Sequence, residues 1–323
     1  MGKRRFWLGV MIFAVVGVWL GNSAFLGPQP SSDPLRLLAH RGVHQTYPRD
    51  GLDVDTCTAR RIYAPQHSFI ENTLPSMQAA FEAGAAVVEL DVHLTPDGAF
   101  AVFHDWELDC RTDGSGVTRQ HTITQLQALD VGYGYSSDGV TYPLRGQGVG
   151  MMPTLSDVLA ADLPGPVLIN VKSRDADEGN ALATRLAEAA SEGKVFGIYG
   201  GHIPTQVALD ALPGMRGYSR QTIKDCILRY AALGWSGRVP DACRDSLLAV
   251  PIDVAPWLWG WPHRFVTRMQ NAGTEVILLG PLDDSGFSAG IDTPDLLAQV
   301  PIGFSGLVWT NRIEVIGPLS EAQ

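Results

Sequence analysis

Eight short apolar runs recur along the chain, and stretches with a helical pattern lie between several of them. The runs begin at Leu35, Val87, Val167, Val195, Met215, Leu248, Val276 and Leu307. Alternating strands and helices are typical of parallel sheets, because each crossover between parallel strands usually carries a helix. Eight such units predict an α/β fold, a (β/α)8 TIM barrel. The runs at 215–219 and 248–252 are the weakest, so a doubly wound sheet stays open.

The stretch around the second run predicts a hairpin inserted at the carboxyl-terminal face of the barrel. Glu89 and Asp91 follow the apolar run at 85–88, and residues two apart in a strand point to the same face. Thr95–Gly98 is typical of a tight turn, after which an antiparallel arm returns His104 to the carboxylates. Two carboxylates and an imidazole suit a hard-cation site with an attached acid or base. Charges on a strand edge and a surface histidine are the alternative reading.

Two other strand ends carry polar side chains. The first strand ends in His40-Arg41-Gly42, which supplies an imidazole, a fixed cation and a flexible backbone. The strand at 167–172 places Asn170 and Lys172 on one face, and Lys172 suits a phosphate as a point charge. Active sites of such barrels lie at the carboxyl ends of the strands.

Long loops are expected at the same face. Residues 43–70 show no clear period, and residues 117–150 are rich in glycine. Loops of this length in a compact domain are usually functional or disordered. Glu71 closes the first loop, just before a helix that Asn72 or Thr73 can cap. Its carboxylate suits either the helix dipole or a place near a metal.

The first residues resemble a targeting segment. A basic cluster, Lys3-Arg4-Arg5, precedes an apolar run from Phe6 to Leu20 that can extend to Leu26. We therefore divide the chain into residues 1–26, a signal sequence or membrane anchor; 27–34, a linker rich in Pro and Ser; and 35–323, the barrel domain. Cleavage after Ala24 leaves Asn22 at a position that favours small residues, so an uncleaved anchor is favoured. Either reading exports the barrel to a periplasmic or extracellular face.

Composition agrees with export and excludes one class of partner. The net charge is −10 and no basic stripe is visible, which argues against nucleic acid. Four cysteines allow three disulfide pairings. We favour Cys57–Cys110, which would tie the long loop to the rim of the site, together with Cys226–Cys243. Four buried free thiols are the alternative.

Two further features have no assigned role. His93 can share the face of Asp91, although a place in a loop is favoured over direct participation. The sequence Trp257-Leu258-Trp259-Gly260-Trp261 suits a lipid or the bilayer surface, where tryptophan is favoured, or a packed loop.

Several short motifs together resemble the glycerophosphodiester phosphodiesterase family, a branch of the phosphatidylinositol-phospholipase-C-like barrels. They are His40-Arg41-Gly42, Glu71-Asn72-Thr73, Glu89-Leu90-Asp91-Val92, Val102-Phe103-His104-Asp105, Arg111-Thr112 with Gly116, Pro153-Thr154-Leu155, and Lys172. Each is short, but together they keep the family's order and a plausible spacing. The resemblance covers residues 36–172, and the rest of the chain matches in general layout.

The resemblance implies His40 and His104 as catalytic residues. It also implies a divalent cation, Ca²⁺ or Mg²⁺, on Glu89, Asp91 and an acidic side chain two residues before the lysine. That last position is Asn170 in this chain. An amide oxygen can bind Ca²⁺ but carries no charge, so the affinity should fall unless Glu71 or a loop carboxylate compensates.

The implied reaction is metal-dependent hydrolysis of a glycerophosphodiester to glycerol phosphate and an alcohol. One histidine takes the proton of a neighbouring hydroxyl as it attacks phosphorus, the other protonates the departing alcohol, and Arg41 and Lys172 hold the phosphoryl oxygens. Two alternatives stay open. One is a relative that cleaves lysophospholipids, and the other is a catalytically impaired, surface-anchored binding protein, which Asn170 motivates.

Overall fold

The computed structural model describes residues 2–23, 27–53, 56–283 and 289–320. Within them, eight parallel strands follow the order β6-β5-β4-β2-β1-β9-β8-β7. They are β1 (Arg36–Ala39), β2 (Ala85–Leu94), β4 (Val167–Val171), β5 (Val195–Gly200), β6 (Gly217–Ser219), β7 (Leu247–Pro251), β8 (Glu275–Leu279) and β9 (Leu307–Thr310). The sheet curls until its end strands β6 and β7 approach each other, which gives a nearly closed barrel. The predicted barrel is therefore confirmed, and its two weakest runs are both strands.

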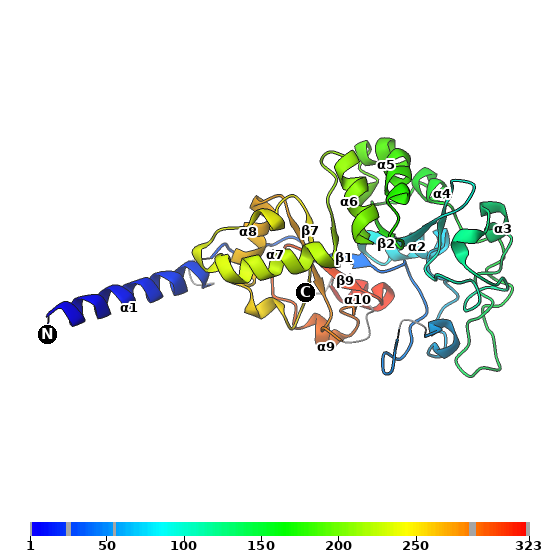
Figure 1. Ribbon diagram of the computed structural model, residues 1–323. Coiled ribbons are helices and arrows are strands. Elements are labelled where there is room, and N and C mark those ends of the chain that lie inside the picture. Colours follow the sequence, from blue (N-terminus) through cyan, green and yellow to red (C-terminus); the bar gives the residue numbers. More distant parts are fainter. Residues whose placement is uncertain (1, 24–26, 54–55, 284–288, 321–323) are drawn as a thin grey trace.

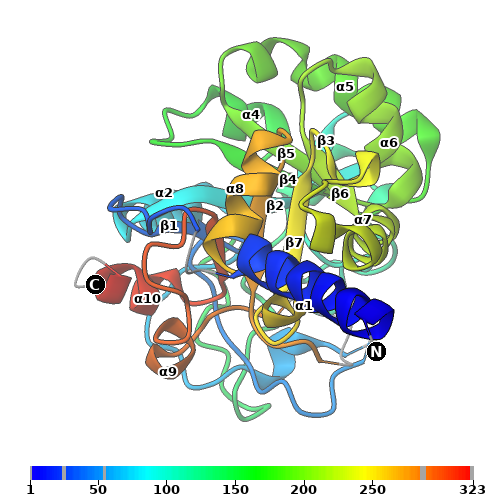
Figure 2. The ribbon, with the colours of Figure 1, turned by 90° about the vertical axis from the view of Figure 1, so that its left-hand side faces the viewer.

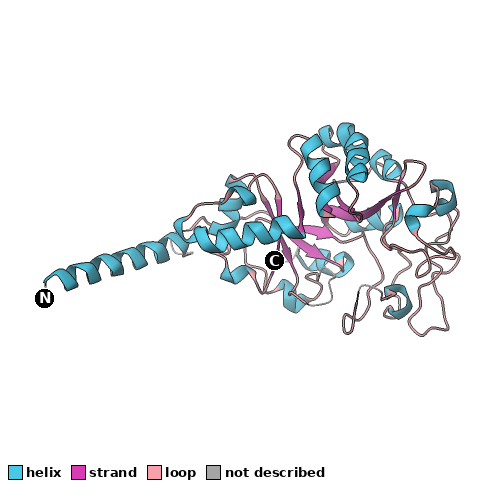
Figure 3. Ribbon diagram, viewed as in Figure 1, coloured by secondary structure: helices cyan, strands magenta, loops and turns pink. Residues whose placement is uncertain are grey.

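Helices surround this barrel (Figures 1 and 3). They are α2 (Leu74–Glu82), α4 (Leu155–Ala160), α5 (Ala176–Ser191), α6 (His202–Ala211), α7 (Arg220–Leu233), α8 (His263–Asn271), α9 (Pro294–Leu297) and α10 (Ile313–Ser320). Side chains cap the starts of several, as the sequence predicts. Thr73 accepts from the Ser76 backbone N–H at the start of α2, and Thr154 accepts from the Asp157 N–H at the start of α4.

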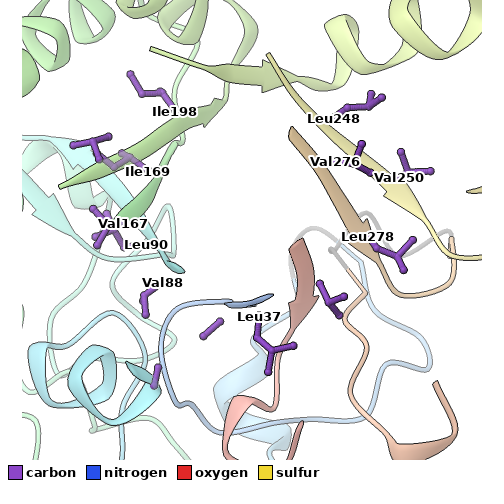
Figure 4. Packing of buried hydrophobic residues seen from close by; sticks show 14 of the residues in the cluster. Leu37, Val88, Leu90, Val167, Ile169, Ile198, Leu248, Val250, Val276 and Leu278 are labelled. Atoms are coloured by element: carbon purple, nitrogen blue, oxygen red, sulfur yellow. The ribbon is translucent and has the colours of Figure 1, made fainter. Parts of the chain in front are cut away.

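Alternation along the strands separates two cores. Outward side chains such as Leu37, Val88 and Leu90 pack against the helices, as Figure 4 shows for 14 of them. Inward side chains, including Val87, fill the barrel below the site. Because side chains alternate across a strand, Glu89 follows Val87 into the interior of the barrel.

The predicted hairpin is present. Strand β3 (Phe100–Val102) pairs antiparallel with β2, with Val92 opposite Val102. The Gly98 N–H donates to the Thr95 carbonyl in the turn, and the Phe103 N–H donates to the Asp91 carbonyl beyond the ladder. That pairing carries His104 back to the carboxylate-bearing part of β2.

The long loops form a small core of their own beside the barrel. This core contains Phe103, Leu108, Tyr135 and Met152, among others. It also holds the short helices η2 (Thr58–Arg61), η3 (Thr118–Gln120) and α3 (Ile123–Gln127). The Cys57–Cys110 disulfide ties its two halves together, and Cys226–Cys243 joins α7 to η5 (Asp241–Cys243). Both favoured disulfide pairings are confirmed.

Helix α1 (Gly2–Asn22) projects from the body at the end where α7 and α8 meet η4 (Gly234–Ser236) (Figures 1 and 2). Its window Arg5–Asn22 is apolar and long enough to cross a membrane, and none of that window is buried.

Candidate active site

A cavity of about 550 Å³ opens at the carboxyl ends of the strands. Its walls include the predicted residues His40, Arg41, His104, Asn170 and Lys172. Two imidazoles from separate parts of the chain therefore face one space. Glu89 and Asp91, both fully buried, lie directly behind this wall and contact its residues.

Protein donors surround the carboxylate of Asp91. Lys172 Nζ and Asn170 Nδ2 each lie 2.9 Å from Oδ1, and Asn72 Nδ2 lies 2.9 Å from Oδ2. The Arg41 guanidinium adds an ion pair at 3.3 Å. Burial by itself raises the pKa of Asp91, but Lys172 and other nearby cations hold the pKa well below its ordinary value.

The negative charge of Glu89 has fewer cations beside it than that of Asp91. Its Oε1 accepts from the Tyr199 hydroxyl at 2.6 Å, and its Oε2 accepts from the Arg41 backbone N–H at 3.1 Å. Burial and the nearby Asp91 raise the pKa of Glu89 to about 8. A carboxylate of this kind gains from a cation beside it.

His40 is held in one orientation by a residue that follows β9, the strand beside β1. Its Nδ1 lies 2.6 Å from Oδ1 of Asn311, just after β9. Asp292 fixes that amide, because it accepts from Nδ2 of Asn311 at 2.8 Å. His40 Nδ1 therefore donates, and its Nε2 accepts from Arg41 Nε at 3.1 Å. Burial and then Arg41 hold the pKa of His40 well below its ordinary value.

A chain of charges orients the second histidine. His104 Nδ1 lies 2.6 Å from Oδ1 of Asp105, whose Oδ2 pairs with Arg111 Nε at 2.9 Å. Arg111 also pairs with Glu71 at 3.1 Å, and Glu71 reaches Arg41 at 3.0 Å. The chain thus links the surroundings of the two histidines. Burial, followed by Arg41 and Lys172, holds the pKa of His104 well below its ordinary value.

Backbone conformation at this site is unusual. Arg41 has φ of 59° and Asn72 has φ of 59°, in the left-handed region that most side chains avoid. A Cβ at Gly42 would lie 2.2 Å from the Ser76 hydroxyl, so only glycine fits there. The strained turn directs the Arg41 N–H at Glu89 and its guanidinium at Asp91.

The residues fit a hard cation with two carboxylates and one amide. Among the described residues, no group of three or more His, Cys, Asp or Glu side chains is arranged to hold a metal. Glu89 and Asp91 supply the charge, and Asn170 lies opposite Asp91 in the strand register. Glu71 is engaged by two guanidinium groups, and its role as a ligand stays a prediction.

Four residues that hold the site were not among the predicted site residues. Asp105 and Arg111 stand in the quoted motifs, and a carboxylate directly after a histidine was a usable signal. Tyr199 ends a barrel strand, which is a weaker one. Asn311 contacts His40 only because the barrel brings β9 beside β1.

His93 is buried, and its ring lies 5.7 Å from that of Trp106. Its Nε2 is 3.4 Å from the His104 carbonyl, and its Nδ1 has no hydrogen-bond partner within the described part of the chain. It does not line the cavity. Trp257 is 85% exposed and Trp259 38%, whereas Trp261 packs against Phe265.

Comparison with known proteins agrees with this geometry. Residues 40–190 match the glycerophosphoryl diester phosphodiesterase family. A glycerophosphodiester phosphodiesterase of Bacillus subtilis (strain 168) is 32% identical over 155 residues, 47% of this chain and 43% of that protein. One of Caldanaerobacter subterraneus subsp. tengcongensis is 42% identical over 62 residues, 19% of this chain and 26% of that protein. The chain thus spans less than half the length of the curated relatives that it matches.

Solved structures share the whole barrel. A glycerophosphoryl diester phosphodiesterase domain from Mycobacterium tuberculosis matches with a TM-score of 0.63 and 17% identity, over 89% of this chain and 99% of that one. An Oleispira antarctica phosphodiesterase in complex with the product sn-glycerol-3-phosphate matches with a TM-score of 0.54 and 19% identity, over 90% and 98%. The family match, the relatives and the shared fold agree: residues 40–190 of this chain belong to the glycerophosphoryl diester phosphodiesterase family.

Proposed function

We propose that this chain hydrolyses glycerophosphodiesters to glycerol phosphate and an alcohol, with His40 and His104 as its acid and base. One observation carries the proposal: both imidazoles line a single cavity together with Lys172 and Arg41. The two cations suit the anionic phosphodiester, whose equatorial oxygens gain charge in the transition state.

Each histidine has a distinct environment, and we assign their roles from it. Burial and the Arg41 cation lower the pKa of His40 and favour its neutral ring, and Asn311 holds the Nδ1 side of that ring in place. Burial, Arg41 and Lys172 favour the neutral form of His104, and Asp105, 2.6 Å from its Nδ1, would stabilise the imidazolium that His104 must form to act as an acid. In the first step, Nε2 of His40 takes the proton of the glycerol hydroxyl next to the phosphate, and that oxygen attacks phosphorus. His104 protonates the departing alcohol. Water then opens the cyclic phosphate with the roles exchanged.

Glu89 and Asp91, with Oδ1 of Asn170 as a third oxygen, would hold a divalent cation such as Ca²⁺ or Mg²⁺. When bound, the cation neutralises a phosphoryl oxygen and acidifies the attacking hydroxyl. Tyr199 and the Arg41 N–H hold Glu89 in place for this task. Lys172 shares Asp91 with the cation and also faces the cavity.

The location of the protein belongs to the same proposal. Helix α1 would anchor the chain in a membrane, with Lys3 and Arg5 on the cytoplasmic side and the barrel on the exported side. The two disulfides support an oxidising compartment.

The test measures release of the choline or ethanolamine head group from glycerophosphocholine, glycerophosphoethanolamine and lysophosphatidylcholine, each with Ca²⁺, with Mg²⁺ and with a chelator. We expect hydrolysis of the first two with a cation. His40→Ala and His104→Ala should each lower kcat by at least about 100-fold and leave the circular dichroism spectrum intact. Near-normal turnover in either variant would refute the assignment.

Asn170 favours one alternative, a binding protein on an inactive barrel, because it removes a charge from the cation site. If none of the diesters is cleaved with any cation, and glycerophosphocholine still binds by calorimetry, the binding protein is correct. Cleavage confined to lysophosphatidylcholine would instead favour the lipid-cleaving relative.

A further inference from the structure

The folded body makes specific contacts with the end of α1. Arg268 of α8 donates from Nη2 to the Gly21 carbonyl at 2.9 Å and from Nη1 to Oδ1 of Asn22 at 2.9 Å. Asn22 Nδ2 donates to the Trp235 carbonyl at 2.9 Å. A helix leaves its last carbonyls without internal partners and favours a cation there, and α1 has no basic residue in its last turn. Arg268 supplies that cation from the barrel.

The same arginine joins the helix end to three other parts of the body. Nη1 of Arg268 lies within hydrogen-bond distance of the Tyr230 hydroxyl, the Gly234 carbonyl and the Trp259 carbonyl. These contacts fix the direction in which α1 leaves the barrel. We call the contacts of Arg268 and Trp235 with Gly21 and Asn22 the seat of α1. A signal peptide that is removed after export does not need such contacts, so they favour a helix that stays attached to the barrel.

Aromatic and basic side chains surround this seat. Trp235 is 49% exposed, and Trp257 and Trp259 are exposed on the loop that Arg268 contacts. A hollow of about 490 Å³ beside them is lined by Arg238, Arg244 and Arg268 and by four uncharged residues. We call Trp235, Trp257, Trp259 and these three arginines the anchor-side surface. Tryptophan prefers the membrane interface, and arginine near the surface attracts anionic lipid headgroups.

The dimensions of α1 place the bilayer at this surface. Its 21 residues span about 31 Å, close to the thickness of the hydrocarbon core. Trp7 and Trp19 lie towards its two ends, as in an aromatic belt. The Asn22 end therefore lies at the edge of the hydrocarbon, and the adjoining anchor-side surface lies in the headgroup layer.

The length of α7 indicates the distance between the bilayer and the active site. Its last residue, Leu233, adjoins η4 at the seat of α1, whereas Arg220 and Ile223 near its start line the active-site cavity. Figure 1 shows α7 beyond the body end of α1, and Figure 2 shows that the two helices lie at an angle to each other. The 14 residues of α7 span about 21 Å, but the headgroup layer extends only about 5–8 Å beyond the hydrocarbon.

We propose that the anchor-side surface rests on the anionic bilayer that holds α1, and that Arg268 fixes this orientation. The active site then stands clear of the headgroups and takes diesters dissolved in water, not lysophospholipids that reside in the bilayer. This substrate choice rests on the proposed hydrolysis, whereas the orientation rests only on the proposed anchoring of α1.

The test uses the full chain reconstituted in phosphatidylcholine–phosphatidylglycerol vesicles that contain a lipid brominated near its headgroup. Bromine quenches tryptophan at short range. We expect Trp235→Phe/Trp257→Phe to remove a large part of the quenched emission. The matched control is Trp106→Phe, because Trp106 is 48% exposed but contacts His93 on the active-site side. Equal loss of quenched emission from both variants would overturn the orientation.

The second arm compares lysophosphatidylcholine held in the same vesicles with dissolved glycerophosphocholine. We expect cleavage of the dissolved diester and at most about a tenth of that rate for the embedded lipid. Equal rates of cleavage for the dissolved diester and the embedded lipid would overturn the inference that the active site stands clear of the headgroups. If neither substrate is cleaved, the proposed function fails, and the quenching result still decides the orientation.

Discussion

At the scale of single residues, Asn170 sets the charge of the site. It lies opposite Asp91 in the register of two parallel strands, and its Nδ2 donates to Asp91 Oδ1. A carboxylate in that place would lie against Asp91 and repel it. The neutral amide therefore stabilises the metal-free site. The expected consequence is a lower affinity for the cation.

This balance predicts the effect of Asn170→Asp. The change keeps the size of the side chain and adds a charge on the cavity wall, so Ca²⁺ should bind about tenfold more tightly in calorimetry. The metal-free variant should unfold at a lower temperature, because two carboxylates then face each other.

Asn72→Asp is the matched control for that variant. Asn72 also donates to Asp91, at 2.9 Å, but it is not part of the cavity wall. It should lose stability with no gain in Ca²⁺ affinity. The placement of the cation site would be contradicted if Asn72→Asp bound Ca²⁺ more tightly than the wild type, or if Asn170→Asp did not.

The residues of the site differ in how far the sequence predicts them. Glu89, Asp91 and Lys172 follow from the alternation of strand side chains, and His104 follows from one local turn. Tyr199 stands on β5 and Asn311 directly after β9, and the neighbours of these strands are set only when the barrel closes. No local pattern states that Asn311 will meet His40, so these supporting contacts required the tertiary structure.

At the scale of elements, two disulfides differ in what they hold. Cys57–Cys110 closes a separation of 53 residues and adjoins Arg111, which pairs with both Asp105 and Glu71. Cys226–Cys243 closes a separation of 17 residues between α7 and η5, and neither cysteine adjoins a residue of those ion pairs in the sequence. The first supports the site, and the second supports the outer wall of the barrel.

Removing each disulfide should therefore give different results. Cys57→Ala/Cys110→Ala should lower kcat severalfold and cost about 3–4 kcal/mol of unfolding free energy. Cys226→Ala/Cys243→Ala should cost about 1 kcal/mol less, because its loop is shorter, and should keep kcat. Urea unfolding and steady-state kinetics on glycerophosphocholine measure both. Equal losses of kcat would show that the first disulfide has no special link to the site.

Elements were also easier to predict than their lengths. The eight strands are visible because each is a short apolar run, and even the three-residue β6 was marked by its spacing. The loop core around Tyr135 was not foreseen. Its apolar residues are scattered over nearly a hundred positions with no regular period, and only the Cys57–Cys110 pair hinted that they gather.

At the scale of the whole molecule, buried titratable groups set how stability depends on pH. Burial is the largest cause that lowers the pKa of His40, His44, His93 and His104 in the folded chain. The unfolded chain binds these protons near pH 6.5, so stability is lost as the pH falls below that value. Burial raises the pKa of Glu89 to about 8, so Glu89 acts in the opposite direction between about pH 4.5 and pH 8.

Below pH 6.5 the four histidines lower the stability more than Glu89 raises it, and above that pH only the effect of Glu89 remains. With chelator present, the unfolding temperature should therefore be highest near pH 6.5–7. It should fall steeply towards pH 5 and slightly towards pH 8. His93 has a pKa of about 4, so it alone costs on the order of 3 kcal/mol at pH 4. His93→Phe should therefore flatten the acid side of the curve, since the aromatic contact with Trp106 can be kept.

Glu89→Gln should remove the decline on the alkaline side, because it removes the buried carboxyl whose pKa is about 8. Glu82→Gln is its control, since the Glu82 side chain is exposed on α2. Thermal unfolding followed by circular dichroism from pH 5 to pH 8 measures all three variants. A wild-type curve that rises steadily to pH 8, or one that Glu89→Gln leaves unchanged, would mean that Glu89 is ionised in the folded chain without a cation. Lys172 and Arg41 would then be enough to neutralise both carboxylates, and the need for a metal at this site would disappear.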